Sequence, residues 1–186
     1  MAPTEIMLIR HAEKPDEAAK TKGVTPNGDS DPEELTVRGW QRTGALIGLF
    51  VGEGRNSALH GLTAPTAIFA SGVGRHSKSL RPQHTVAPLA EKIGVRVNTA
   101  HLKGDETALV ADILRQDGIV LVAWEHEAIP QIANLVTGNE TTCPQSWPGE
   151  RFDVVWVFER SDDGSNWSFH QVPQQLLSGD SVEPIG

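Results

Sequence analysis

The chain has 186 residues, of which 38% are hydrophobic and 22% are charged, and its formal net charge is −8 at pH 7. This length suits a single domain, residues 1–186, that buries most of its apolar surface in one core. The negative charge argues against nucleic acid or an anionic membrane as the main partner, although it leaves room for a local basic pocket. The single cysteine, Cys143, excludes an internal disulfide and a zinc site built from several thiolates.

The chain contains no segment that indicates membrane insertion or secretion. Its amino-terminal apolar run, Ile6–Ile9, is too short for the hydrophobic part of a signal peptide. No stretch approaches the roughly 18 apolar residues of a membrane span. We therefore expect a soluble, cytoplasmic protein, and nothing in the sequence indicates its oligomeric state.

Apolar runs and helical patterns alternate along the chain. Five runs predict strands at Glu5–Ile9, Ala67–Ala70, Val95–Asn98, Ile119–Trp124 and Phe152–Glu159. Between them, helical patterns cover Leu35–Val51, about Leu80–Ile93, Asp105–Gln116 and a segment from Glu127 to Gly138. Strands that alternate with helices predict an α/β fold, a three-layer sandwich in which helices cover both faces of a mostly parallel sheet.

The pattern also predicts the solvent exposure of one side chain and of the carboxyl-terminal segment. Arg42, one turn after Gly39 on the first helix, is expected to lie on the solvated helix face. The segment from Pro173 to the end of the chain is weakly patterned, so we expect it to fray or to pack loosely.

Ionisable residues gather at the ends of two predicted strands. Arg10 and His11 end the first strand, and Glu125, His126 and Glu127 follow the fourth. In open parallel sheets the ligand crevice lies outside the carboxyl ends of the strands. The two histidines, far apart in the sequence, are therefore expected at the same edge of the sheet.

Four motifs in this order resemble those of the histidine phosphatase superfamily, which includes the phosphoglycerate mutases and the histidine acid phosphatases. LIRHAEKP resembles the opening Arg-His-Gly motif, with Ala12 in place of glycine, and ELTVRGWQRTGAL resembles the start of the helix that follows it. SLRPQHTVAPLAEKIGV resembles the segment that supplies a second arginine, here Arg81. VAWEHEAIPQIA resembles the Gly-His segment at a strand end, with Glu125 in place of glycine. The resemblance runs from Met7 to about Glu159 and implies a phosphoglycerate mutase-like fold.

The resemblance also implies an activity. It implies a metal-independent phosphatase that hydrolyses phosphomonoesters, or phosphohistidine, through a covalent phosphohistidine intermediate on His11. Arg10 and Arg81 would offer planar, charged donors to the phosphoryl oxygens, and His126 would add a third donor. Neighbouring cations favour a neutral His11, which nucleophilic attack requires. We expect no metal or other cofactor, and a small phosphorylated substrate or phosphate ion as the ligand.

The proton donor for the leaving group remains open between two acids. Glu127 resembles the acid that follows the second histidine in the acid phosphatases and is preferred, while Glu13 lies two residues from the nucleophile. Either must be protonated to act as an acid. Glu125, where the superfamily has glycine, would repel a phosphate, receive a proton or point away from the site.

The second arginine is also open. Ser71 and Arg75 have the same spacing as Ser77 and Arg81, but only Arg81 has a threonine, Thr85, four residues further on. We therefore prefer Arg81 and place Arg75 in a loop at the rim of the pocket. The natural substrate is not readable, because its recognition would depend on the loops at 15–34, 72–80 and 138–150.

Rival functions are weighed against hydrolysis. A phosphomutase would need a second basic set for another phosphate, and none is apparent. A non-catalytic phosphate-binding module on the same fold remains an alternative. The His-Ala-Glu sequence at 11–13 also begins the motif of zinc deaminases, but the chain lacks the Cys-x-x-Cys that completes it.

Overall fold

The computed structural model describes residues 2–52, 61–75 and 77–186. In these residues six strands form one sheet with the order β3-β2-β4-β1-β5-β6. The strands are β1 (Pro3–Arg10), β2 (Ala67–Ala70), β3 (Val97–Asn98), β4 (Gly118–Trp124), β5 (Val154–Arg160) and β6 (Trp167–Pro173). β3, β2, β4 and β1 run parallel to one another, whereas β5 is antiparallel to β1 and β6 is antiparallel to β5.

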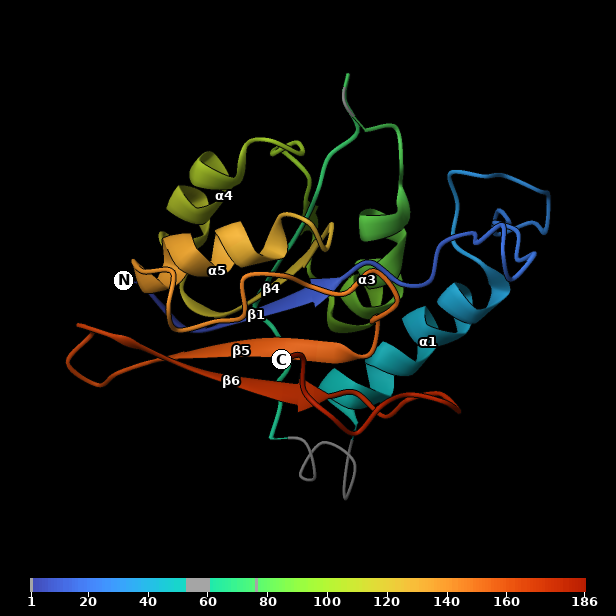
Figure 1. The fold of residues 1–186 in the computed structure, drawn as a ribbon. Helices are drawn as coiled ribbons and strands as arrows, with labels where there is room; N and C mark the ends of the chain where they lie inside the picture. The colour runs from blue at the N-terminus through green and yellow to red at the C-terminus, as the bar shows by residue number, and fades with distance from the viewer. Residues whose placement is uncertain (1, 53–60, 76) are drawn as a thin grey trace.

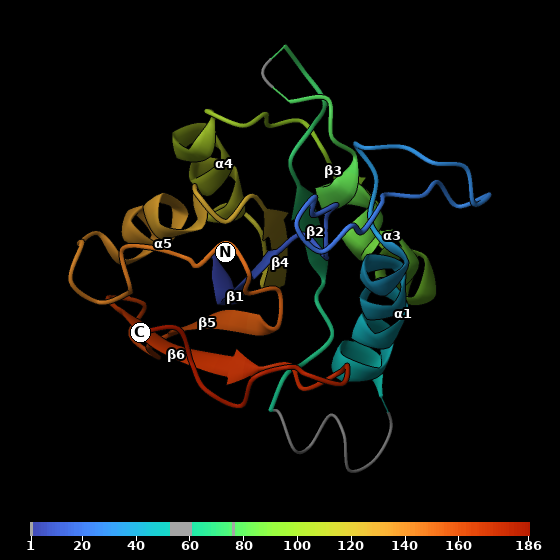
Figure 2. The same ribbon diagram turned by 45° about the vertical axis from the view of Figure 1, so that its right-hand side comes forward.

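Helices cover both faces of this sheet, as Figures 1 and 2 show. They are α1 (Val37–Val51), α3 (Arg81–Ile93), α4 (Glu106–Ile113) and α5 (Ile129–Thr137). Alternate residues of the central strands point to opposite faces. Leu121 packs in the core on the α1 and α3 side, and its neighbours Val120 and Val122 pack in the core on the α4 and α5 side. The three-layer α/β arrangement with a mostly parallel sheet is therefore confirmed.

The strand that sequence patterning missed is β6. Its residues alternate between exposed and partly buried positions, because the strand lies at the sheet edge beside β5. An edge strand with one solvated face shows no continuous apolar run, so it lacks the signal that marked the other five.

Local sequence signals account for the helix ends. α1 begins at Thr36, whose side-chain oxygen accepts a hydrogen bond from the Gly39 backbone nitrogen at 3.1 Å. α3 and α5 end at Gly94 and Gly138, which adopt φ values of 71° and 72° in the left-handed region that favours glycine.

The start of α1 packs directly on the chain that leaves β1. A Cβ atom on Gly39 would lie 2.6 Å from the backbone oxygen of Glu13, which is too close for any side chain there. The Thr36 backbone nitrogen also donates to that oxygen at 2.9 Å. The segment that follows His11 is therefore held against the helix.

Two expectations about exposure were wrong. Arg42 is buried, because its guanidinium is surrounded by carboxylates and an amide rather than by solvent. The carboxyl-terminal segment is also packed: Gln174 and Ile185 are buried, and the backbone of Ile185 bonds the side chain of Gln171 on β6. Figure 1 shows this segment returning beside β6.

No helix in the described ranges is long and apolar enough to cross a bilayer.

Candidate active site

The carboxyl ends of β1 and β4 bring the two predicted histidines together. Arg10 pairs with Trp124 in the parallel register, and the His11 backbone nitrogen donates to the Trp124 oxygen at 3.1 Å. His126 follows two residues after Trp124. Both histidines line the same cavity, whose volume is about 370 Å³.

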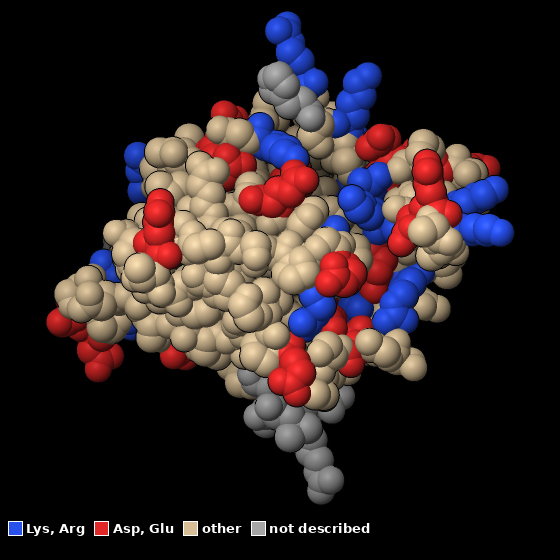
Figure 3. Space-filling model, viewed as in Figure 1, with Lys and Arg blue, Asp and Glu red and all other residues tan. Residues whose placement is uncertain are grey.

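This cavity, which we call the histidine cavity, is rich in charged side chains. Its lining residues are His11, Lys14, Glu33, Arg75, Ser77, Lys78, Ser79, Arg81, Pro82, Lys103, Glu125, His126 and Glu127. Lysines and arginines outnumber acids among them, although the whole chain is acidic. Figure 3 shows charged side chains of both signs crowding the right-hand part of the surface, toward which β1 points in Figure 1. The positive excess suits an anionic ligand.

His11 is buried and neutral. Its Nδ1 lies 2.8 Å from the backbone oxygen of Ala12, and because a carbonyl oxygen only accepts, Nδ1 carries the hydrogen and Nε2 carries the lone pair. Burial, together with the positive charges of Arg10, Arg81 and Lys14, lowers the pKa of His11 to about 3, although the hydrogen bond to Ala12 opposes this shift. The ring is therefore an available nucleophile at neutral pH.

Arg10 lies beneath the loop that precedes β5 and is not among the residues that line the histidine cavity. Its Nη1 donates to the backbone oxygens of Gly149 and Arg151, and its guanidinium carbon lies 3.8 Å from the ring centre of Phe152. Its Nε and Nη2 are buried and have no partner among the described residues. Burial lowers the pKa of Arg10 to about 10, partly offset by Glu150 and Glu13, so the group stays charged at neutral pH.

Arg81 and Arg75 both line the histidine cavity. Arg81 is held at the start of α3, where its Nε and Nη2 donate to the backbone oxygens of Glu34 and Pro32. Burial lowers the pKa of Arg81. Arg75 is exposed on the loop after β2. The structure thus places both candidates at the cavity, with Arg81 the more firmly held of the two.

Thr85 connects α3 to the segment that follows His11. Its hydroxyl donates to the Arg81 backbone oxygen at 2.7 Å and accepts from the Ala12 backbone nitrogen at 2.8 Å. The residue after His11 is thereby fixed to the helix that carries Arg81. This bond gives a physical role to the threonine four residues after Arg81, which sequence reasoning used only as a spacing.

We expect Thr85→Val to destabilise the fold by about 1–3 kcal/mol, because it leaves the buried Ala12 N–H without an acceptor. Urea unfolding monitored by tryptophan fluorescence measures the change. Thr43→Val is the matched control: Thr43 is also buried on a helix and donates to the backbone oxygen four residues earlier, Gly39, but no bond from a neighbouring segment reaches it in the described structure. Equal losses from the two substitutions would contradict the role of the Ala12 bond.

His126 is partly buried opposite His11. Burial and the charge of Arg10 lower its pKa, against the opposing effect of Glu127. A Cβ on Gly149 would lie 3.7 Å from His126 Nε2, so the loop that covers Arg10 also passes close to this ring. A neutral imidazole retains one N–H donor for an anion in the cavity.

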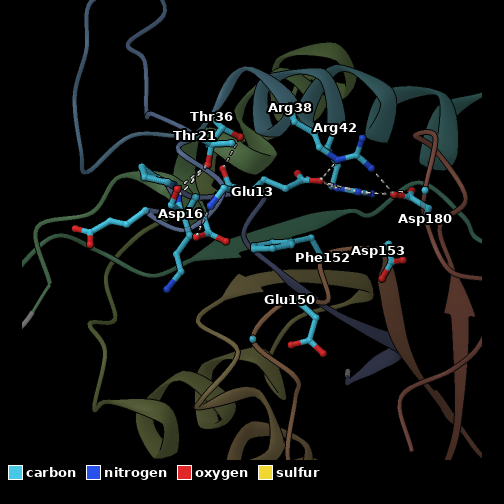
Figure 4. A pocket seen from close by; sticks show the side chains of 16 residues that line it. Glu13, Asp16, Thr21, Thr36, Arg38, Arg42, Glu150, Phe152, Asp153 and Asp180 are labelled. Carbon is cyan, nitrogen blue, oxygen red and sulfur yellow. Dashed lines mark hydrogen bonds and ion pairs between the residues drawn. The ribbon is translucent and has the colours of Figure 1, made fainter.

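Both candidate proton donors from the sequence lie in ion pairs. Glu127 lines the histidine cavity, but its exposed side chain accepts from Lys103 Nζ at 2.8 Å, a hydrogen bond that lowers its pKa. Glu13 accepts from Arg42 at 2.8 Å and from Arg38 at 3.1 Å. It lines a separate cavity of about 720 Å³, shown in Figure 4.

Glu125 is the acid on which the sequence left three outcomes open. Its side chain lines the histidine cavity, and its Oε1 accepts from the Ser71 hydroxyl at 3.1 Å. Burial raises its pKa. Its other oxygen, Oε2, is buried and has no hydrogen-bond partner among the described residues.

Sequence reasoning missed Lys103 and Arg42. Lys103 reaches the cavity from the loop before α4, and nothing in its surroundings, HLKGDE, indicates a site residue. Arg42 had a usable signal, because it lies four and seven residues before the buried Leu46 and Leu49 and so on the same helix face.

Within the described residues, no group of three or more His, Cys, Asp or Glu side chains is arranged to hold a metal ion. No family model and no curated protein sequence matches the chain.

Solved structures do match it. A phosphoserine phosphatase mutant from Entamoeba histolytica, solved in complex with phosphoserine, aligns over 93% of this chain and 98% of its own, with a TM-score of 0.55 and 13% identity. A phosphoglycerate mutase from Plasmodium falciparum aligns over 100% of this chain and 98% of its own, with a TM-score of 0.52 and 10% identity. The protein histidine phosphatase SixA, solved with tungstate, aligns over 91% and 97%, with a TM-score of 0.50 and 15% identity. The phosphoglycerate mutase-like fold that the motifs implied is thus confirmed in the backbone.

Proposed function

We propose that the chain is a metal-independent phosphatase that hydrolyses phosphomonoesters, or phosphohistidine, through a covalent phosphohistidine on His11. The observation that carries this proposal is the state of the His11 ring. Its Nδ1 is bonded to Ala12, its pKa is lowered by burial and by three cations, and the residue lines a cavity with a positive excess. A neutral imidazole that is held in one tautomer beside an anion site can attack the phosphorus atom of a bound phosphoester.

The surrounding cations would provide the stabilisation of charge that a phosphoryl group requires. The charge of a transferring phosphoryl group is spread over three equatorial oxygens, and catalysis rests on positioned donors. Arg81 and His126 line the cavity, and Arg10, next to His11 in the chain, has two buried nitrogens, Nε and Nη2, without a partner in the described chain. A bound phosphate would supply acceptors for donors of this kind. The similar structures solved with phosphoserine and with tungstate support a phosphorylated substrate.

Trapping the intermediate tests the mechanism directly. Wild-type protein is mixed with ³²P-labelled aryl phosphate, quenched in base within milliseconds, and digested for mass spectrometry. We expect label on His11 that is stable in base and labile in acid, with chelator present throughout. Turnover without a labelled histidine would reject the covalent route. Binding of phosphate without turnover would favour a binding module, and transfer to a second substrate hydroxyl would favour a mutase.

We expect activity on 4-nitrophenyl phosphate to persist at pH 5. A histidine with an ordinary pKa near 6.5 loses about 25-fold of its neutral form between pH 7 and pH 5. Because the pKa of His11 is lowered to about 3, kcat/KM should change by less than about 3-fold, once corrected for the second ionisation of the substrate. A 25-fold fall would contradict the neutral ring.

The lowered pKa of His11, which preserves activity in acid, makes the fold less stable there. A histidine whose pKa is lowered on folding contributes stability above its unfolded value of 6.5, and this contribution is lost as the pH falls toward 3. Tryptophan fluorescence at each pH is therefore required, so that unfolding is not mistaken for protonation of the nucleophile.

A further inference from the structure

The leaving group of a phosphomonoester needs a proton. Among the described acids that line the histidine cavity, Glu33 lies 3.8 Å from Arg81 and Glu127 lies 2.8 Å from Lys103, and Glu125 has no ion pair with a lysine or arginine. Glu127 is held by Lys103, and Glu13 is held by Arg42 and Arg38 outside this cavity. A carboxylate that accepts from a cation is stabilised in its ionised form and is a poor proton donor at neutral pH. Glu127 thus favours its ionised form, and Glu13 lines a different cavity.

Glu125 is in the opposite situation. It lines the cavity beside His126, and its Oε2 is buried without a hydrogen-bond partner in the part of the chain that the structure describes. An ionised oxygen left unpaired in this way is costly, whereas a protonated carboxyl carries no net charge. Its Oε1 accepts from Ser71, whose backbone oxygen in turn accepts from Gln83 on α3 at 3.1 Å. The carboxyl is therefore positioned by neighbours that carry no charge.

Charged groups reach Glu125 from two further elements. Lys103, in the loop before α4, favours the ionised form, and Glu106, on α4, favours the protonated form. Burial is the largest influence, and together these influences raise the pKa of Glu125 above its usual value of 4.5. Geometry and charge thus both favour the protonated form of this group.

We propose that Glu125 is the proton donor for the leaving group in the phosphatase reaction, a proposal that rests on the function proposed above. As the bond from His11 Nε2 to phosphorus forms and the ester P–O bond breaks, Glu125 gives its proton to the departing oxygen. The resulting carboxylate then takes a proton from the water that attacks the phosphohistidine, and the P–N bond breaks to release phosphate. To reach the departing oxygen, the carboxyl turns about its last side-chain torsion, which is soft for glutamate, and Oε2 leaves its buried position.

The substrate class follows from this assignment. An acid in the site is needed for alkyl phosphates, because an alkoxide is a poor leaving group. It accelerates the hydrolysis of aryl phosphates or phosphohistidine much less, because their leaving groups depart readily. We therefore assign alkyl phosphomonoesters, such as phosphoserine-like or sugar phosphates, as the substrates that this site is built to hydrolyse.

The test compares two leaving groups in Glu125→Gln. We expect kcat/KM for an alkyl phosphate, 2-phosphoglycerol, to fall by about 10²-fold, while kcat/KM for 4-nitrophenyl phosphate falls by less than about 5-fold. Glu127→Gln, the same change two residues further on, should affect both substrates to the same extent. A selective loss in Glu127→Gln, or an equal loss on both substrates in Glu125→Gln, would overturn the proposal.

A second variant tests the proton itself and serves even where Glu125→Gln folds poorly. kcat/KM for the alkyl phosphate should fall as the pH rises through the pKa of Glu125, and Ser71→Ala removes a hydrogen bond that lowers this pKa. We expect the fall of kcat/KM with pH to occur about half a pH unit higher in Ser71→Ala than in the wild type. A fall that does not move would reject Glu125 as the titrating group.

These outcomes separate the two proposals. A wild type that forms phosphohistidine but shows no leaving-group effect in Glu125→Gln overturns the assignment of Glu125 alone. A wild type inactive on both substrates overturns the phosphatase function, and the assignment of Glu125 with it.

Discussion

His11→Ala should lower kcat for 4-nitrophenyl phosphate by at least about 10³-fold, because removal of a covalent nucleophile leaves only binding and electrostatic stabilisation. Among the described histidines, only His126 lines the cavity with His11, and in the described structure no backbone oxygen bonds its ring as Ala12 bonds that of His11. Initial rates at pH 6, with chelator present, measure the effect.

The matched control is His101→Ala. His101 lies outside the residues that line the histidine cavity and pairs with Asp112 at 2.7 Å. We expect its loss to leave kcat within about 2-fold of the wild type. His11→Asn adds a further comparison, because it removes the nucleophile but keeps an amide donor near Ala12. Inorganic phosphate should still bind this variant, and equal rates for wild type and His11→Ala would show that His11 is not the nucleophile.

The position of this site could be predicted because two general rules act together. Apolar runs that alternate with helical patterns predict a parallel sheet, and the carboxyl ends of its strands lie at one edge. Arg10, His11 and His126 follow such runs directly, so their side chains were expected together, and His11 and His126 do line one cavity. The order of strands did not have to be known for this, since every parallel strand ends at the same edge.

The partners of Arg10 could not be predicted. Its guanidinium donates to the backbone oxygens of Gly149 and Arg151, which lie about 140 residues further along the chain. Because every residue has a backbone oxygen, the sequence does not indicate which of these oxygens accepts a hydrogen bond from Arg10. The contact of this loop with His126 and Arg10, through Gly149 and Phe152, likewise could not be predicted from the sequence.

The partners of Glu13 were equally hidden. Charge alone allowed Glu13 to pair with Lys14 or Arg38, and the structure adds Arg42, which joins it to Asp180 near the end of the chain. Sequence patterning treated Arg42 as solvated because arginine is rarely buried. It is buried here because two carboxylates and one amide satisfy its donors, a condition that depends on contacts between distant segments.

Arg42→Met should therefore destabilise the protein by about 3–5 kcal/mol, among the largest effects of any single substitution outside the apolar core. The change leaves Asp180 and Glu13 with part of their charge unpaired and removes the buried hydrogen bonds between α1 and the carboxyl-terminal segment, while those from Arg38 stay in place. Burial raises the pKa of Asp180, but the hydrogen bonds from Arg42 and from the Leu176 and Leu177 backbone lower it by more. The stabilisation is thus present above the unfolded value of 3.8 and is lost as the pH falls below it.

Arg38→Met provides a control with the same partners and a different environment. Arg38 contacts the same two carboxylates, Glu13 at 3.1 Å and Asp180 at 3.2 Å, but its side chain is 42% exposed, against 2% for Arg42. An exposed ion pair is screened by water, so its loss should cost less than about 1 kcal/mol. Urea unfolding at pH 7 and pH 3.5 measures both variants. We expect Arg42→Met alone to lower the free energy of unfolding strongly, and we expect this loss to be smaller at pH 3.5 than at pH 7. That result would show that burial, and not the number of contacts, determines how much these ion pairs stabilise the fold. Similar losses from both substitutions would refute this account.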